Sequence, residues 1–145
     1  MLCPPVDADA HRLAHSLAPP AAALASDCTC DSLADIRYTN NAIGSVCPAA
    51  FAGLSNCGYL SLRGNRIGAL PDGMFDDLTS LVVLFLSDNE LTAVGSATAF
   101  QGMPLLEEID LRGNRLTSVP DGLFSGLSRL ELLMVYVGRH LDLMT

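Results

Sequence analysis

The side chains able to do acid–base, nucleophilic or phosphate chemistry are few and scattered. The chain has three histidines, His11, His15 and His140, and no lysine. All three lie outside the regular part of the sequence described below, so none is expected beside a nucleophile on a rigid strand. Without lysine there is neither a Schiff-base amine nor the cation of a phosphate-binding glycine loop. We therefore predict no enzyme activity and no cofactor.

Glu107, Glu108 and Asp110 form a short cluster of carboxylates. A general acid and base pair would need shielded and unequal environments for two of them. The open sheet inferred below instead favours ordinary solvated charges at these positions. Their expected role is therefore in binding and not in catalysis.

The five cysteines do not form a metal-binding pattern. Cys28 and Cys30 make a C-x-C motif, but no second pair or histidine stands near enough to complete a tetrahedral zinc site. Cys57 occupies a position that holds leucine in the related segments, which indicates a core residue. An odd count leaves at least one cysteine outside any intramolecular disulfide.

Composition limits the classes of protein and of partner. At 145 residues and 15.3 kDa, the chain is long enough for one compact domain or a short repeat array. Half of it is apolar and 17% is charged, which excludes disorder throughout. Sixteen acidic residues against eight basic ones disfavour a nucleic-acid partner. No apolar run approaches the ~18 residues of a membrane span.

A repeat of about 24 residues organises the chain. The frame L-x-x-L-x-L-x-x-N-x-L begins at residues 33, 57, 81 and 106, and an incomplete fifth copy begins at 130. The second half of each unit repeats too, with a phenylalanine column. That column consists of Phe51, Phe75, Phe100 and Phe124.

These residues resemble the leucine-rich repeat family, in the 24-residue form typical of extracellular receptors and matrix proteins. The resemblance covers residues 33 to about 137. It implies an α/β repeat solenoid, right-handed, with one short parallel strand per repeat on a concave face and loops or short helices on the convex face.

The same shape follows from the residues. Side chains alternate across an extended L-x-L segment, so the aliphatic ones point to a single core face. One 24-residue unit cannot bury that face alone, whereas stacked units cover one another. We therefore expect Leu60, Leu84 and Ile109 to lie side by side in adjoining parallel strands.

An asparagine stands at the same place in four repeats, where the strand must turn and leave backbone groups unpaired. A carboxamide both donates and accepts hydrogen bonds, so stacked asparagines could satisfy successive turns. Four solvated turn asparagines are the alternative. The predicted ladder consists of Asn41, Asn65, Asn89 and Asn114.

The N-terminal end resembles the cysteine-bearing cap of extracellular leucine-rich repeat proteins. Cys28, Cys30 and Cys47 are the candidate cap cysteines, but Tyr38 replaces the expected third cysteine of the motif. Residues 1–26 match no repeat and read as disordered or as a degenerate signal segment. Residues 27–137 then form the repeat domain, and residues 138–145 a tail or truncated repeat.

The C-terminal end shows no second cap. The fifth strand carries apolar side chains with nothing after it in the repeat pattern to cover its edge. We expect either a longer array or a partner at this edge, and self-association of the isolated chain through residues 130–137.

Outward positions of the strand frame supply the predicted partner-binding residues. Large apolar groups there are not needed for the core, and they stand beside an acidic and arginine patch, the usual composition of an interface. Alternatively, Tyr59 leans on the next repeat, and Glu108 and Arg112 pair across strands with little effect. The full set is Tyr59, Arg63, Val83, Phe85, Glu108, Asp110, Arg112, Met134 and Tyr136.

The sequence thus predicts a non-catalytic module that recognises a protein through its concave strands, as a fragment of a secreted or receptor-type protein. An intracellular scaffold or adaptor and a regulatory segment of a larger multidomain enzyme are the alternatives. The C-T-C motif and the repeat form favour an extracellular or cell-surface location, although the chain lacks Asn-x-Ser/Thr sites. Disulfides would indicate an oxidising compartment and reduced thiols the cytosol.

Overall fold

The computed structural model describes residues 16–17, 34–48 and 50–137. These residues contain seven short strands and no helix. The strands are β1 (Ser16–Leu17), β2 (Ala34–Arg37), β3 (Ser45–Val46), β4 (Cys57–Ser61), β5 (Val83–Phe85), β6 (Glu108–Asp110) and β7 (Leu132–Met134).

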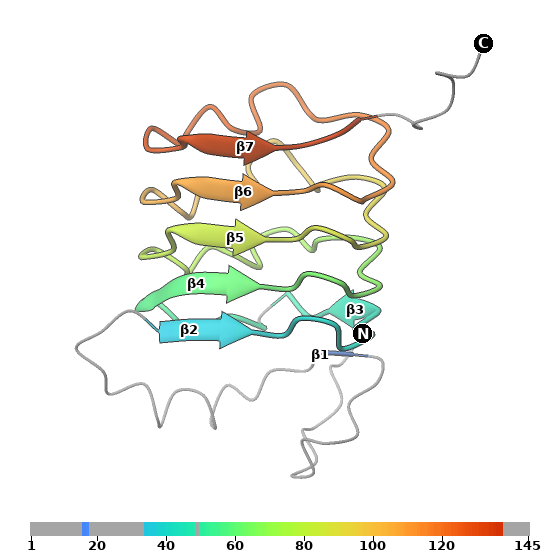
Figure 1. Ribbon diagram of the computed structural model, residues 1–145. Helices are drawn as coiled ribbons and strands as arrows, with labels where there is room; N and C mark the ends of the chain where they lie inside the picture. Colours follow the sequence, from blue (N-terminus) through green and yellow to red (C-terminus); the bar gives the residue numbers. More distant parts are fainter. Residues whose placement is uncertain (1–15, 18–33, 49, 138–145) are drawn as a thin grey trace, which may run out of the picture.

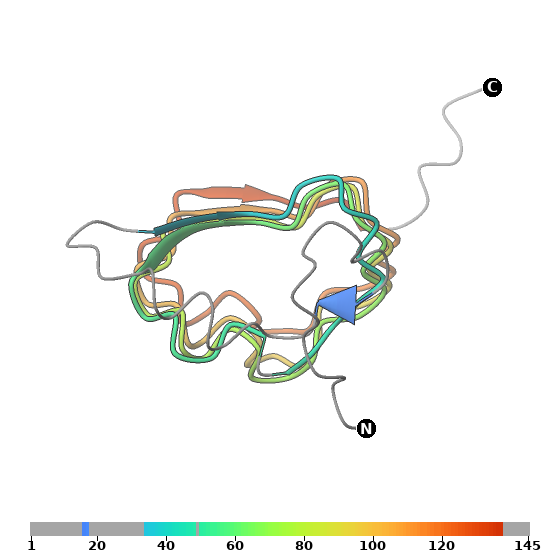
Figure 2. The ribbon, with the colours of Figure 1, turned by 90° about the horizontal axis from the view of Figure 1, so that it is seen from below.

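Five of the strands form one parallel sheet in the order β2-β4-β5-β6-β7, with one strand from each repeat (Figure 1). Each repeat is a coil of chain that returns to start the next strand. Seen along the stack, the coils lie over one another around a shared interior (Figure 2). The predicted solenoid of stacked parallel strands is confirmed.

The aliphatic columns meet in the register that the repeat frame predicts. Leu60 pairs with Leu84, and Leu84 with Ile109, in adjoining strands. All three side chains are fully buried. One face of the sheet is therefore core, and the alternate side chains point away from it.

The phenylalanine column fills the interior behind the sheet. Neighbouring rings lie 5.9 to 6.1 Å apart between centroids, and their planes differ by 11 to 29°. Phe51, Phe75 and Phe100 are almost completely buried, whereas Phe124 in the last complete coil is only partly buried. Phe75 and Phe100 thus each pack between two other rings, whereas Phe51 and Phe124, at the two ends of the column, each have one ring neighbour.

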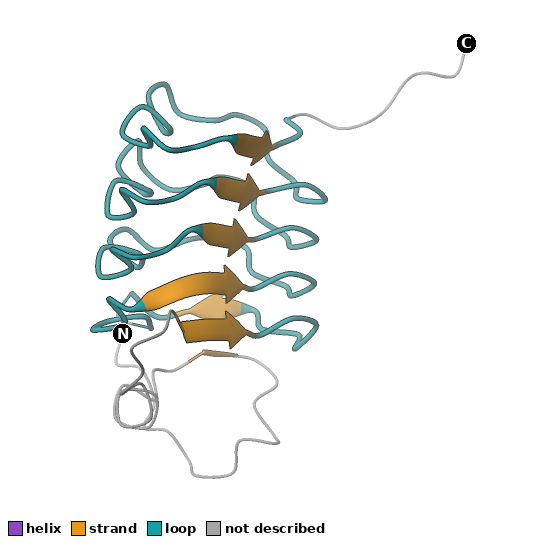
Figure 3. Ribbon diagram, turned by 60° about the vertical axis from the view of Figure 1, so that its left-hand side comes forward, coloured by secondary structure: helices purple, strands orange, loops and turns teal. Residues whose placement is uncertain are grey.

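Apart from β3 in the first coil, the side of each coil opposite the sheet consists of turns and loops (Figure 3). Short backbone hydrogen bonds close these turns, as from Leu78 N to Phe75 O at 3.0 Å and from Leu127 N to Phe124 O at 3.1 Å. The family resemblance implies either loops or short helices on this side of the solenoid, and the described residues form loops without a helix.

At the N-terminal end, β1 pairs in parallel with β3. Ser16 and Leu17 are the only described residues of the 1–26 segment. Cys47 is disulfide-bonded, and its partner lies outside the described residues, as do Cys28 and Cys30. Cys57 is buried in the leucine column, at the start of β4.

At the other end, β6 is the one described neighbour of β7. Large apolar side chains are exposed here, with 45% of Leu132, 39% of Leu133, 70% of Tyr136 and 50% of Val137 accessible. Residues 138–145 lie outside the described part of the chain. Self-association through residues 130–137 stays a prediction. No helix in the described residues is long and apolar enough to cross a membrane.

A pair of equivalent glycines tests how tightly successive coils pack. A Cβ added at Gly102 would lie 2.6 Å from Asp76 Cα and 3.0 Å from the Phe75 carbonyl oxygen of the previous coil. At Gly126, one repeat later, the nearest atom is Gln101 Cγ at 3.7 Å. We expect Gly102→Ala to lower the free energy of unfolding by about 1–3 kcal/mol through overpacking.

The matched variant Gly126→Ala should be neutral, or should stabilise by up to about 1 kcal/mol through lower entropy of the unfolded chain. Urea unfolding of both variants measures the difference. Equal free energies for the two variants would contradict the close contact between coils at Gly102.

Candidate partner-binding surface

The side chains that point away from the core form a regular grid on the sheet, here called the strand surface. The pairing register sets two rows that cross all five strands. A third row follows from alternation just beyond the strand ends. The first row is Asp35, Tyr59, Val83, Glu108 and Leu132; the second is Arg37, Ser61, Phe85, Asp110 and Met134; the third is Thr39, Arg63, Ser87, Arg112 and Tyr136.

An aromatic cluster lies near the centre of the strand surface. The rings of Tyr59 and Phe85 meet edge to face, with centroids 5.5 Å apart and planes 80° apart. The Arg37 guanidinium lies 4.4 Å from the centroid of the Tyr59 ring. Tyr59, Phe85 and Val83 are half-buried, so part of each remains accessible. The rings support one another across strands, as the alternative interpretation of Tyr59 anticipated, and still present apolar area.

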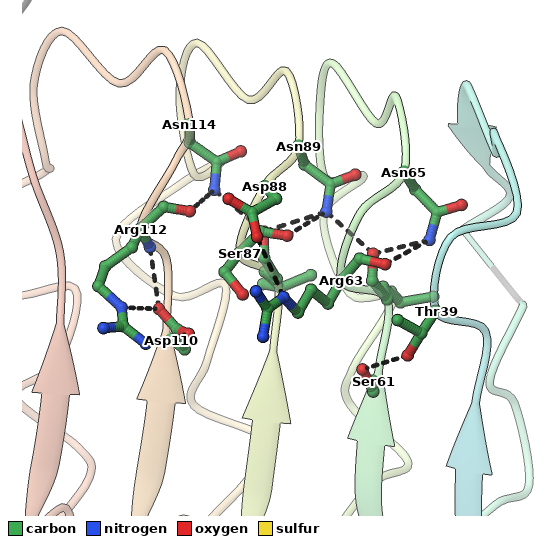
Figure 4. A network of polar contacts seen from close by, with 12 residues as sticks. Thr39, Ser61, Arg63, Asn65, Ser87, Asp88, Asn89, Asp110, Arg112 and Asn114 are labelled. Atoms are coloured by element: carbon green, nitrogen blue, oxygen red, sulfur yellow. Dashed lines mark hydrogen bonds and ion pairs between the residues drawn. The ribbon is translucent and has the colours of Figure 1, made fainter.

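Three polar side chains of the second and third rows are buried. Ser61 and Asp110 in the second row and Ser87 in the third are each no more than 3% exposed. The Ser61 hydroxyl lies 3.0 Å from that of Thr39, within hydrogen-bond distance (Figure 4). A partner could therefore touch the second row mainly through Arg37, Phe85 and Met134, which are exposed or half-buried.

Asp110 is buried, which corrects the expectation of a solvated charge at this position. The Arg112 side chain binds it through two hydrogen bonds, Nε to Oδ1 at 2.9 Å and Nη2 to Oδ2 at 3.0 Å. The Arg112 backbone N–H adds a third at 3.1 Å. Burial by itself opposes ionisation of this carboxyl, but the hydrogen bonds from Arg112 outweigh it and lower the pKa of Asp110.

Arg63 is held by an ion pair to the next coil. Its Nε lies 3.0 Å from Asp88 Oδ2, and both side chains are more than half exposed. Asp88 has a left-handed backbone, with φ at 56°. Gly64 and Gly113 occupy the equivalent place in neighbouring coils, with φ of 71° and 67°. Aspartate tolerates this backbone conformation less well than glycine does. The ion pair with Arg63 supplies a reason for an aspartate at this position.

Asn65, Asn89 and Asn114 bond through their carboxamides to backbone groups of their own coil and the previous one (Figure 4). Asn89 accepts from Ile67 N at 3.1 Å and donates to Leu62 O and Leu86 O at 2.9 and 3.1 Å. Asn65 and Asn114 make the equivalent bonds one coil away.

Asn41 belongs to the same sequence column but has different contacts. It is exposed, and its carboxamide donates to Thr39 O within its own coil at 3.2 Å. The first coil instead receives its ladder bonds from Asn65, whose Oδ1 accepts from the backbone N–H of Asn41 at 3.0 Å.

The structure thus brings the predicted binding residues together on one surface, with Met134 and Tyr136 at the β7 side of it. Sequence reasoning did not anticipate the ion pair of Asp88 with Arg63 or the burial of Ser61 and Ser87. A signal for Asp88 existed, because it stands in a column that holds Gly64 and Gly113. Among the described residues, no group of histidine, cysteine, aspartate or glutamate could hold a metal ion.

Comparison with known proteins agrees with this architecture. The sequence matches the family model described as leucine rich repeat over residues 31–91, 55–116 and 92–135. No curated protein is similar enough in sequence to count as a relative.

Several solved structures are similar to this chain. The leucine-rich repeat domain of APL1B is 27% identical with a TM-score of 0.69, and the match covers 75% of this chain and 34% of that one. TLR13 in complex with ssRNA13 is 30% identical with a TM-score of 0.58, covering 63% and 13%. The Drosophila Toll–Spatzle complex is 28% identical with a TM-score of 0.61, covering 65% and 13%. The chain therefore spans about a third of the first of these and far less of the other two.

Replacing a buried ladder asparagine tests its contribution to stability. We expect Asn89→Ala to lower the free energy of unfolding by roughly 1–3 kcal/mol, because several buried backbone groups lose their partner. Asn41→Ala is the matched control and should cost less, since its carboxamide makes one exposed bond. Urea unfolding measures both. A loss below a few tenths of a kcal/mol for Asn89→Ala would exclude an energetic role for the ladder.

The pair of Asp110 and Arg112 should make stability depend on pH. The folded pKa of Asp110 is lowered, so its contribution is present above the unfolded value and is lost as pH falls through the folded value. A double-mutant cycle of Asp110→Asn and Arg112→Gln should therefore give a stabilising coupling near neutral pH that declines below about pH 4. Urea unfolding measures the coupling free energy near neutral pH and again below about pH 4. An equal coupling free energy under the two conditions would contradict the ionic nature of the pair.

Proposed function

Because the chain belongs to the leucine-rich repeat family, we propose that it is a non-catalytic recognition module that binds a partner protein through its strand surface. The observation that carries this proposal is the aromatic cluster of Tyr59, Val83 and Phe85. These three side chains are half-buried on the face of the sheet opposite the core, where the aliphatic columns do not need them. Aromatic anchors of this kind dominate the energetics of many interfaces.

The dimensions of the strand surface suit a protein segment. Five strands about 4.8 Å apart make a strip about 20 Å wide, comparable with one side of a modest interface. A row of exposed or half-buried side chains crosses the whole strip. Backbone hydrogen bonds between coils hold that row in place, so little ordering entropy would be lost on binding.

Protein is the preferred class of partner over nucleic acid. One similar structure is TLR13 in complex with ssRNA13 and another is Toll in complex with Spatzle, so related folds hold different ligands. In this chain the net charge is −8, and each arginine of the strand surface has a carboxylate partner within the chain. Phosphate backbones need available cations. The charge pattern therefore supports a protein ligand.

An extracellular or cell-surface location accompanies this role. Cys47 is disulfide-bonded, and disulfides persist in oxidising compartments. The similar structures include receptor and ligand assemblies such as the Toll–Spatzle complex. Both observations favour a piece of a secreted or receptor-type protein over an intracellular scaffold.

The experiment is a binding measurement with an array of secreted proteins, followed by surface plasmon resonance on the hits. We expect Tyr59→Ala and Phe85→Ala each to weaken binding about ten-fold or more, because truncating a central aromatic anchor commonly costs at least that much. Asp121→Asn, an exposed change away from the sheet, is the control and should bind as the wild type does.

Urea unfolding of each variant separates lost binding from lost fold. If both aromatic variants fold like the wild type and bind every hit with unchanged affinity, the strand surface is not the binding site.

A further inference from the structure

The charged side chains of the strand surface are almost all paired within the chain. Arg37 Nη2 lies 2.9 Å from Asp35 Oδ2, and Arg63 Nε lies 3.0 Å from Asp88 Oδ2. Arg112 Nε lies 2.9 Å from Asp110 Oδ1. Each of these pairs is electrically neutral, and Arg112 uses both Nε and Nη2 on Asp110.

Glu108 is the exception. It points outward from β6, and none of the ion pairs among the described residues includes it. Arg112 is on the same strand surface, four residues along the chain, but Asp110 lies between them and holds the Arg112 guanidinium through both Nε and Nη2. The strand surface therefore carries one uncompensated charge, the negative charge of Glu108.

Apolar side chains flank this carboxylate across the strands. In the pairing register Glu108 lies between Val83 on β5 and Leu132 on β7. Tyr59 continues the row beyond Val83. A docked partner would exclude water from these apolar groups, and an opposite charge brought to Glu108 would then interact more strongly than it does in bulk water.

The chemistry of the partner follows from this arrangement. An acidic segment would meet repulsion both at Glu108 and from the net charge of −8. A metal ion would need more ligands than one carboxylate, and no such group occurs in the described residues. A partner segment with a basic side chain between apolar ones matches both the negative charge of Glu108 and its apolar neighbours Val83 and Leu132.

We propose, on the basis of the proposed function, that the strand surface binds a protein segment that places a lysine or arginine side chain on Glu108, with apolar residues on either side of that cation. Glu108 then selects the partner's charge, and the aromatic cluster with Leu132 takes the apolar flanks. The charged pairs of the neighbouring rows stay intact and hold the surrounding side chains in position.

The experiment uses a phage-displayed library of random 12-residue peptides selected on the full chain. We expect the enriched peptides to share a lysine or arginine with apolar neighbours. A synthetic peptide from this set should bind Glu108→Gln about ten-fold more weakly or worse, as expected for a lost interfacial charge pair. Asp121→Asn removes the same charge far from the strand surface and should leave affinity unchanged.

A charge reversal makes the test specific. Glu108→Arg should reject the basic peptide and bind a version in which aspartate or glutamate replaces the cation. Affinity for wild type should also fall with added salt more steeply than affinity for Glu108→Gln.

The possible failures are distinguishable. Selected peptides that need Phe85 but show no basic preference, and that bind Glu108→Gln like wild type, overturn this inference and leave the proposed function intact. A selection that gives no peptide sensitive to Phe85→Ala overturns both.

Discussion

The whole structure depends on one constraint, that a coil of about 24 residues is too small to bury its own apolar side chains. Each coil therefore needs a neighbour on either side in a fixed register. Leu60, Leu84 and Ile109 meet that need in the sheet, and the stacked phenylalanines meet it behind the sheet. Burial is complete in the middle coils and incomplete at the last one, where Leu133 is 39% exposed. Stability is thus shared between neighbouring coils, and among the described coils the one with β7 buries its apolar side chains least.

Hydrophobic contacts alone would let one coil slide along the next, and the asparagines oppose this. The Asn89 side chain bonds to two coils at once. It bonds to Ile67 N and Leu62 O in the previous coil and to Leu86 O in its own coil. These bonds form in a buried setting, where an unpaired group costs the most. They reinforce the register of the strand pairing, and the register in turn sets which outward side chains become neighbours.

The sequence predicted the parts of the structure that repeat. The aliphatic columns and the parallel strands recur once in every repeat. Each repeat therefore gives the same structural assignment to its equivalent residues, and the order of the strands in the sheet follows the order of the repeats in the chain. Asp110 and Asp88 could not be predicted in this way. Their settings depend on single contacts, with Arg112 in one case and with Arg63 of the previous coil in the other. A pattern shared by all repeats carries no information on a contact that only one repeat makes.

Alternation along a strand separates residues that hold the fold from residues free to specify a partner, but the separation here is incomplete. Ser61 and Asp110 in the second row and Ser87 in the third point outward and are nonetheless buried, so larger side chains at those positions would displace their neighbours. In the first row Tyr59, Val83 and Glu108 are half-buried and Leu132 is exposed, and none contributes to the aliphatic columns. Specificity can therefore change most freely along the first row, where Glu108 supplies its one charge without an internal partner.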